Sequence, residues 1–259
     1  MSEQDLLYNV ADGVAHFTIN REKNRNSISA ATVTLFLDYL DQAEADQEVR
    51  VICITGAGEK AFCSGADLGN VMSGDRNQQA DPLRNYAKLL KRLASYTKPT
   101  VARINGYCLA GGTGFMLACD IVIATEDAKF GTPEVNVGLF PMMIGALIFR
   151  NVLRKKAMEM ILLGEKLTAA QALDMGMVTR VVPRERLDEE VQTVLKSLAV
   201  KSPIGMKIGK QAFYAMDMMP IDDALDHLCE KLREVAATED AAEGITAFIE
   251  KRTPVFKGR

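Results

Sequence analysis

The chain has 259 residues, which is enough for one large domain or two smaller ones. Hydrophobic residues make up 48% of the composition and charged residues 25%, as is typical of a globular protein. The formal net charge is -3 and no long basic tract occurs, which argues against a surface that follows the phosphates of a nucleic acid.

Membrane, secretory and metal-binding signals are missing from the sequence. No apolar run reaches the roughly 18 residues that a membrane span needs, and residues 1–5 are acidic and begin no apolar signal segment. The five cysteines are odd in number and form no CxxC pair, so we expect reduced thiols in a cytoplasmic protein. With only two histidines and no ligand-like spacing, we expect no metal site.

The first 185 residues predict strands that alternate with helices. Residues 6–10 and 14–19 form two strands joined by a tight turn, and Ser29 is placed to cap the helix that follows. Residues 69–82 are polar and turn-rich, which predicts a mobile surface loop. Further strands are predicted at 49–55, 100–104, 121–125 and 178–182, and further helices at 83–96, 112–119, 154–163 and 169–175.

The last quarter of the chain predicts helices alone. Their ranges are 187–199, 204–219, 221–236 and 239–250. The pattern therefore predicts an α/β core followed by an all-helical segment.

Two glycine-rich loops are the most informative feature. They are Phe-Cys-Ser-Gly-Ala-Asp-Leu at 62–68 and Asn-Gly-Tyr-Cys-Leu-Ala-Gly-Gly at 105–112, and each follows a short apolar run. Small residues in such turns let main-chain N–H groups face a ligand without obstruction. Two such donors on one oxygen would form an oxyanion hole. A lone acid, Glu134, follows shortly afterwards, so the set suits chemistry in which a carbonyl becomes an enolate.

These motifs belong to a longer ordered series. It comprises residues 21–27, 61–68, Lys98-Pro99, 105–107 with 110–112, Cys119-Asp120, Phe-Gly-Thr-Pro-Glu at 130–134, and the C-terminal segment 248–259. Over essentially the whole chain the series resembles the crotonase superfamily, the enoyl-CoA hydratase/isomerase family.

The resemblance implies the fold and the assembly. Residues 1–195 would form an α/β spiral of repeated ββα units that carries the CoA-thioester site. Residues 196–259 would form a helical C-terminal trimerisation domain, so that the chain assembles as a homotrimer or as a hexamer built from two trimers. The substrate would be an acyl-CoA, with no metal or redox cofactor because CoA is part of the substrate.

The resemblance also implies the catalytic residues. The N–H groups of Ala66 and Gly111 would hold the thioester oxygen, and Glu134 would act as the acid/base. Gly111 precedes a predicted helix, so its N–H would be an unsatisfied first-turn donor. Asp67 is a candidate for contact with the substrate, but it also has a structural interpretation, because a carboxylate beside a developing oxyanion would oppose it.

Further residues are candidates for contact with the substrate. Lys23, Arg25 and Lys98 would meet CoA, whereas Phe115, Phe140 and Met142 would line an acyl pocket, although apolar side chains are more often core. Phe248 and Lys251 resemble positions that reach CoA from a neighbouring subunit. The set is completed by Ala61, Ser64, Leu68, Gly112, Gly114 and Pro133.

Gly114 departs from the family pattern. Hydratases of the family usually carry a second glutamate at this position, and a single carboxylate suffices for a 1,3-proton shift. We therefore slightly favour double-bond isomerisation. Hydration on Glu134 alone, with Gly114 leaving space for a bulkier acyl chain, stays open, as does a non-catalytic CoA-thioester-binding homologue. The apolar segment 139–143 argues against a dienoyl isomerase, and the absence of a GxSxG motif argues against a serine hydrolase.

Overall fold

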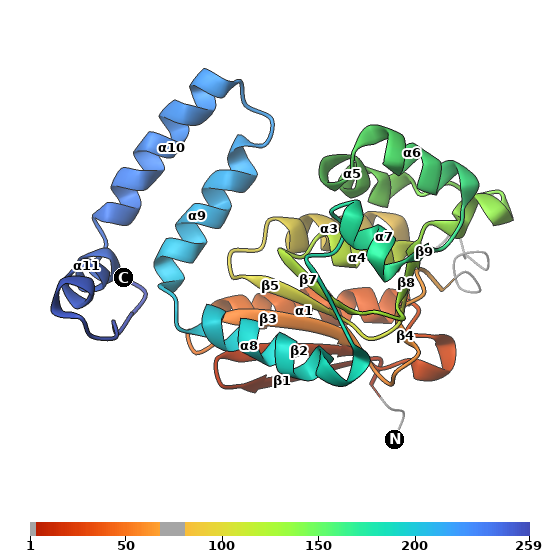
Figure 1. The fold of residues 1–259 in the computed structure, drawn as a ribbon, viewed down its shortest axis with the longest axis horizontal. Coiled ribbons are helices and arrows are strands. Elements are labelled where there is room, and N and C mark those ends of the chain that lie inside the picture. The colour runs from red at the N-terminus through yellow and green to blue at the C-terminus, as the bar shows by residue number, and fades with distance from the viewer. Residues whose placement is uncertain (1–3, 68–80) are drawn as a thin grey trace.

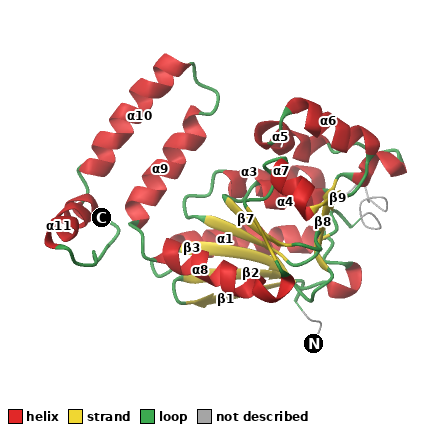
Figure 2. Cartoon of the chain, viewed as in Figure 1, coloured by secondary structure: helices red, strands yellow, loops and turns green. Residues whose placement is uncertain are grey.

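The computed structural model describes residues 4–67 and 81–259, and within them two sheets form the centre of the molecule (Figures 1 and 2). In the larger sheet the first two strands pair antiparallel and the others pair parallel. Its spatial order is β1 (Leu6–Ala11), β2 (Val14–Ile19), β3 (Val51–Gly56), β5 (Thr100–Ile104), β7 (Ile121–Thr125) and β10 (Arg180–Val182).

The smaller sheet interleaves with the larger one along the chain. Its order is β4 (Ala61–Cys63), β6 (Tyr107–Leu109), β8 (Lys129–Gly131) and β9 (Leu167–Thr168). The strands β4, β6 and β8 run parallel, and each directly follows a strand of the larger sheet. A helix then follows, so the expected succession of ββα units is present.

Helices cover both faces of the larger sheet and continue beyond it (Figure 2). They are α1 (Ala30–Ala45), α3 (Pro82–Ala94), α4 (Gly111–Leu117), α5 (Met142–Asn151), α6 (Arg154–Leu163), α7 (Ala169–Asp174), α8 (Leu187–Ala199), α9 (Pro203–Met216), α10 (Ile221–Ala236) and α11 (Glu239–Glu250). Short 3-10 helices lie at η1 (Glu22–Asn24), η2 (Pro133–Val137) and η3 (Arg184–Arg186).

Two apolar clusters hold the sheet between its helices. The main cluster includes Phe17, Phe36 and Phe115, which are completely buried between the sheet, α1 and α4. The second cluster joins α8 to the opposite face, where Val191 and Leu195 pack against inward residues of β2, β3, β5 and β7. Because both faces of the central parallel strands are covered, those strands read as nearly continuous apolar runs.

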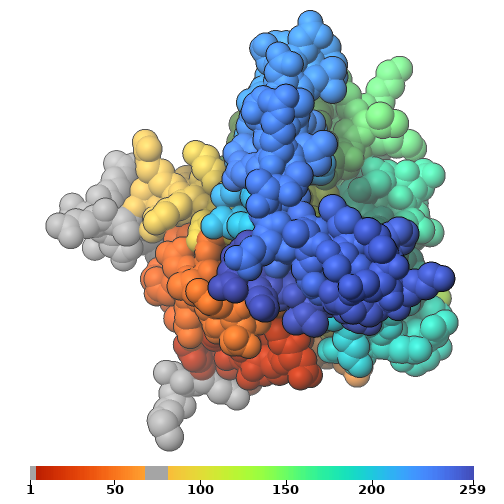
Figure 3. All heavy atoms as spheres, turned by 90° about the vertical axis from the view of Figure 1, so that its left-hand side faces the viewer, coloured from red at the N-terminus to blue at the C-terminus, as the bar shows by residue number. Residues whose placement is uncertain are grey.

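The C-terminal helices α9, α10 and α11 project away from the core (Figures 1 and 3). The helix α8 spans the predicted domain boundary at residue 195 and packs on the sheet. In the part of the chain that the structure describes, no helix combines the length and the apolar character needed to cross a membrane.

Most predicted elements are confirmed. Strands 14–19, 100–104 and 121–125 and helices 154–163, 187–199, 221–236 and 239–250 agree residue for residue. Ser29 caps α1 as expected, since its side chain accepts a hydrogen bond from the Thr32 N–H at 3.1 Å. The strands of the smaller sheet and α5 were not predicted, and the loop predicted at 69–82 lies almost entirely outside the described residues.

Candidate active site

The candidate site lies where three neighbouring strands of the smaller sheet end. The strands β4, β6 and β8 are parallel and adjacent, so their carboxyl ends meet at one edge. The chain leaves β4 into Gly65-Ala66, leaves β6 into Ala110-Gly111, and leaves β8 toward Glu134. The sheet therefore brings together the three residues that the sequence predicts as catalytic, from three separate segments of the chain.

The two glycine loops touch each other. A side-chain carbon built on Gly65 would lie 2.6 Å from the Ala110 Cβ and 3.0 Å from the Gly111 nitrogen. Gly65 also has φ +97°, a conformation that L side chains rarely adopt. Glycine at this position thus permits the close approach of the loops, which brings the main chains at Ala66 and Gly111 near each other.

Both predicted oxyanion donors have their N–H groups available. Ile28 donates to the Gly65 carbonyl at 2.8 Å and accepts from the Asp67 N–H at 3.0 Å, in a parallel bridge between Ile28 and Ala66. In such a bridge the N–H of Ala66 itself points away from Ile28. Within residues 4–67 and 81–259, neither the Ala66 nor the Gly111 N–H donates a hydrogen bond.

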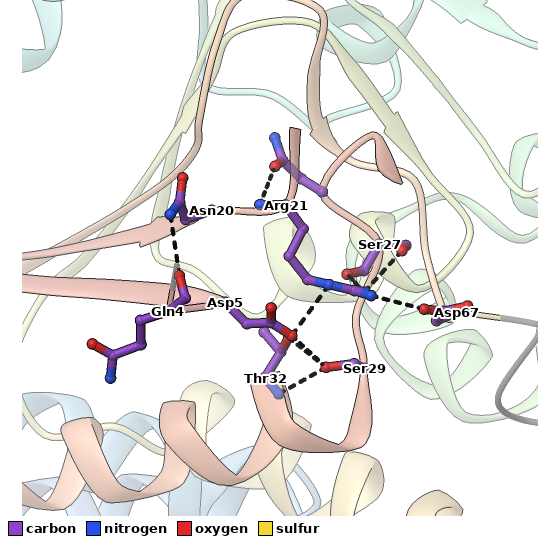
Figure 4. A network of polar contacts seen from close by, with 9 residues as sticks. Gln4, Asp5, Asn20, Arg21, Ser27, Ser29, Thr32 and Asp67 are labelled. Atoms are coloured by element: carbon purple, nitrogen blue, oxygen red, sulfur yellow. Dashed lines mark hydrogen bonds and ion pairs between the residues drawn. The ribbon is translucent and has the colours of Figure 1, made fainter. Parts of the chain in front are cut away.

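Arg21 anchors the loop beside Ala66 (Figure 4). Its Nη2 lies 2.9 Å from Asp67 Oδ2 and its Nε lies 3.2 Å from Asp5 Oδ2, while its Nη1 donates to the Ser27 carbonyl at 2.6 Å. The Arg21 side chain is 13% exposed and that of Asp67 is 20% exposed. The guanidinium therefore compensates the Asp67 charge next to Ala66, which fits the structural interpretation of Asp67 rather than substrate contact.

The second loop holds a strained residue. Ala110 has φ 50° and ψ -125°, which costs a non-glycine residue about 1–3 kcal/mol. The strain is held by hydrogen bonds to β8, because the Ala110 N–H and the Thr113 hydroxyl donate to the Gly131 carbonyl at 2.9 and 3.1 Å. The turn that presents Gly111 is thereby fixed to the segment that leads to Glu134.

Glu134 sits on η2, which begins at Pro133. Its Oε2 atom is buried and has no hydrogen-bond partner in the described part of the chain. Burial raises the pKa of the Glu134 carboxyl, and the residue's own backbone N–H opposes this only in part. A carboxyl whose pKa is raised takes up a proton more readily than an ordinary glutamate does, as the predicted acid/base must before it can return one.

The structure leaves no space for a side chain at Gly114, the position at which the family usually carries the second glutamate. Gly114 is buried, and a side-chain carbon built on it would overlap Ile144 Cγ2 and lie 3.2 Å from Tyr86 Oη. The expectation that Gly114 leaves space for a bulkier acyl chain is wrong, because Ile144 of α5 and Tyr86 of α3 already fill that space.

Two predicted contact residues belong to other parts of the structure. Phe115 is completely buried and packs between Phe36 and Tyr86, so it is a core residue and not part of a pocket wall. Lys98 donates to the carbonyls of Ala43 and Asp46 at 2.6 Å, which satisfies the carboxyl end of α1 instead of leaving the ammonium to meet CoA.

The other predicted residues are distributed unevenly around the site. Ser64, Gly112 and Pro133 lie just after the carboxyl ends of the three strands, whereas Ala61 is at the amino end of β4. Lys23 and Arg25 are exposed, and Arg25 is tied to the first loop because its carbonyl accepts from the Ser64 N–H at 3.1 Å. Phe140 and Met142 are 46% and 75% exposed before and at the start of α5. Leu68 lies outside the described residues.

Phe248 and Lys251 are remote from this site in their own chain. They lie at the end of α11, which is separated from β8 and α4 along the longest axis of the molecule (Figure 1). Any contact of theirs with a ligand at such a site would have to be made in another copy of the chain.

The chemistry of the remaining candidate groups is limited. Burial raises the pKa of the Cys53 and Cys63 thiols to about 12, so both stay protonated and unreactive near neutral pH. Among residues 4–67 and 81–259, no three His, Cys, Asp or Glu side chains are grouped so that they could hold a metal ion.

Sequence reasoning missed Tyr86. It lies on an ordinary amphipathic helix, 25 residues before Gly111, yet its hydroxyl donates to the Gly111 carbonyl at 2.7 Å. No local motif marks Tyr86, because its contact with Gly111 arises only from the packing of α3 against α4.

Comparison with known proteins agrees with this geometry. Residues 9–259 match the family described as enoyl-CoA hydratase/isomerase. The chain is 34% identical to the 2,3-dehydroadipyl-CoA hydratase of Escherichia coli K12 (98% of this chain and 99% of that protein). It is also 34% identical to the 1,2-epoxyphenylacetyl-CoA isomerase of the same strain, with 98% of each protein covered.

A solved structure shows the same fold. The enoyl-CoA hydratase of Bacillus anthracis superposes with a TM-score of 0.94 at 32% identity, covering 99% of this chain and 100% of that one. The ββα spiral, the C-terminal helices and the match over nearly all residues lead to one conclusion. The chain is an enzyme of the enoyl-CoA hydratase/isomerase family, within the crotonase superfamily.

Proposed function

We propose that the enzyme moves the double bond of an enoyl-CoA thioester through an enolate, with Glu134 as its acid/base. One observation carries the proposal: the half-buried carboxylate of Glu134, with one oxygen buried and unbonded, lies at the same sheet edge as two unused main-chain donors, and the position of a second carboxylate is occupied by Ile144 and Tyr86.

The proposed reaction is a proton transfer between two carbons. Glu134 removes a proton from one carbon of the allylic system, and the electron pair moves onto the thioester oxygen. The N–H groups of Ala66 and Gly111 stabilise that oxygen, and the loss of one such donor typically costs about 3–4 kcal/mol. Protonated Glu134 then returns the proton to the other carbon, so no external oxidant, water or metal enters the balance.

Hydration is the second candidate. It is favoured by the similarity to proteins named as hydratases, in which case water would add to the β carbon with Glu134 alone as the acid/base. An experiment must decide between isomerisation and hydration, because both reactions would pass through the enolate and use the same three residues.

Incubation with 3-enoyl and 2-enoyl thioesters separates the possibilities. Isomerisation converts one into the other, hydration yields a 3-hydroxyacyl thioester, and a binding homologue does neither. Glu134→Gln should lower kcat at least about 1,000-fold while thioester binding is nearly retained. Glu126→Gln, at an exposed glutamate, serves as the control, and retained activity in Glu134→Gln would overturn the assignment.

We further propose that the chain assembles as a homotrimer or as a hexamer. Support comes from large apolar side chains exposed on the C-terminal helices, such as Phe213, Leu232 and Ile249 at 61%, 68% and 73% exposure. The proposed chemistry needs no metal or redox cofactor, and the buried free thiols suit a reducing, cytoplasmic setting.

A further inference from the structure

Tyr86 joins α3 to the first turn of α4. Its Oη donates to the Gly111 carbonyl at 2.7 Å, and its ring packs edge-on against Phe115, with the ring centroids 5.7 Å apart. A side-chain carbon built on Gly111 would lie 2.9 Å from the same Oη. Glycine is therefore needed at 111 for the phenol to approach, and the phenol supplies a restraint that glycine lacks.

Tyr86 adds a restraint at Gly111 to the bonds that tie Ala110 and Thr113 to the Gly131 carbonyl. The preceding residue, Ala110, is strained at φ 50°, and the cap of α4 has no side-chain hydrogen bond. A glycine that follows a strained residue at a helix start has access to alternative backbone conformations. The Tyr86 bond restricts them because it fixes the direction of the Gly111 carbonyl.

The phenol is suited to act as a permanent donor. Burial raises the pKa of Tyr86 well above its ordinary value, and the nearby thiols of Cys63 and Cys108 and the charge of Glu134 act in the same direction. The hydroxyl thus stays protonated at any pH at which the enzyme would work.

We propose that Tyr86 is a positioning residue, whose hydrogen bond to the Gly111 carbonyl holds the Gly111 N–H in line with the thioester oxygen. The inference rests on the proposed function, because it assumes that this N–H binds that oxygen. The phenol acts through the main chain of Gly111 and takes no part in proton transfer.

Tyr86→Phe tests the proposal because it removes only the hydroxyl. We expect kcat to fall about ten-fold with KM changed less than two-fold, since the effect concerns the enolate more than substrate binding. Tyr96→Phe is a matched control. Tyr96 is a buried tyrosine whose hydroxyl also donates to a backbone carbonyl at 2.7 Å, that of Leu40, away from the site. It should lower the denaturation midpoint and leave kcat unchanged.

A spectroscopic readout separates positioning from a general loss of structure. In the Glu134→Gln background, a thioester with a ¹³C-labelled carbonyl should show a C=O stretching band at lower frequency when bound, because hydrogen bonds polarise the carbonyl. Adding Tyr86→Phe should move the band back toward the free value, and adding Tyr96→Phe should not.

The outcomes are distinct. If the band shifts on binding and Tyr86→Phe changes neither the band nor kcat, the role of Tyr86 is refuted and the proposed function stands. If Tyr96→Phe lowers kcat as much as Tyr86→Phe, the effect is structural and the inference also fails. If the bound carbonyl shows no shift in Glu134→Gln itself, the proposed oxyanion hole is wrong.

Discussion

At the scale of single residues, the surroundings of Glu134 disfavour the charged form of its carboxyl group. It has no cationic partner in the described part of the chain, one oxygen is buried and unbonded, and burial raises the pKa of the group. Asp67, which also lies at this edge, is compensated by Arg21. Carboxylates with such different surroundings are assigned different tasks, one to chemistry and one to structure.

The unfavourable charge on Glu134 should lower the free energy of unfolding of the wild type. Since the folded-state pKa lies above the ordinary value of 4.5, the charged group opposes folding at high pH, and this penalty disappears as the pH falls through the raised pKa. Glu134→Gln should therefore unfold at a higher denaturant concentration than the wild type at pH 8. The gain should be less than about 1 kcal/mol, because solvent still screens the partly exposed side chain.

The pH dependence is the decisive part of that measurement. The difference between Glu134→Gln and the wild type should shrink as the pH is lowered from 8 toward the ordinary value of 4.5, because the wild-type carboxyl takes up its proton as the pH falls through its raised pKa. Glu126→Gln, at an exposed position, should show no comparable trend. The opposite result would be a Glu134→Gln variant that is less stable than the wild type at pH 8, with a stability difference that does not change with pH. That result would show that the carboxylate is well solvated.

At the scale of elements, the site depends on how loops are fixed after short strands. The strand β4 has three residues, and the turn that follows it is held from outside by Ile28 and by the Arg21 network (Figure 4). Arg21→Met would leave Asp67 partly buried without its guanidinium. We expect a loss of about 3 kcal/mol in the free energy of unfolding, measured by urea titration, because the partly buried ion pairs of Arg21 with Asp5 and Asp67 and its hydrogen bond to the Ser27 carbonyl are lost together.

An exposed arginine supplies the comparison. Arg186 pairs with Glu189 at 3.4 Å, and both side chains are more than half exposed. Arg186→Met should therefore cost less than about 1 kcal/mol. Equal losses from the two variants would mean that the Arg21 network is as weak as a surface ion pair, and that it does not anchor the Ala66 loop.

The sequence allowed the long elements to be predicted and left the short ones unseen. Helices such as 221–236 show a clear apolar periodicity, whereas β4, β6, β8 and β9 have only two or three residues each, too few to show any period. The apolar helix α5 was missed because it follows Pro141 and carries few polar residues to mark an exposed face. Contacts between residues that are distant in the sequence cannot be inferred from local patterns either. The positions of Tyr86 and Ile144 beside Gly111 and Gly114 are therefore known only from the structure.

At the scale of the whole molecule, the C-terminal helices expose more apolar surface than a free, solvent-facing segment usually does. They extend from the core (Figure 1) and expose large apolar side chains over much of their length. Large apolar side chains that gather on one segment are often covered by a partner. The arrangement is most easily understood if another copy of the chain covers these helices.

The assembly and the activity should therefore change together. We expect the wild type to have three or six times the chain mass in light scattering, and we expect Leu232→Glu combined with Ile249→Glu to shift it toward the monomer, because two charges would be buried at the interface. Gln192→Glu on α8, which adds a charge at an exposed position, should leave the mass unchanged.

Activity adds a second test of that assembly. If Phe248 and Lys251 contact CoA in a neighbouring copy, a monomeric variant must have a higher KM, since α11 cannot reach the site of its own chain (Figure 1). The kcat should change less, because Ala66, Gly111 and Glu134 all come from one chain. A wild type that stays monomeric at micromolar concentration and is fully active would contradict both the proposed assembly and the role of α11.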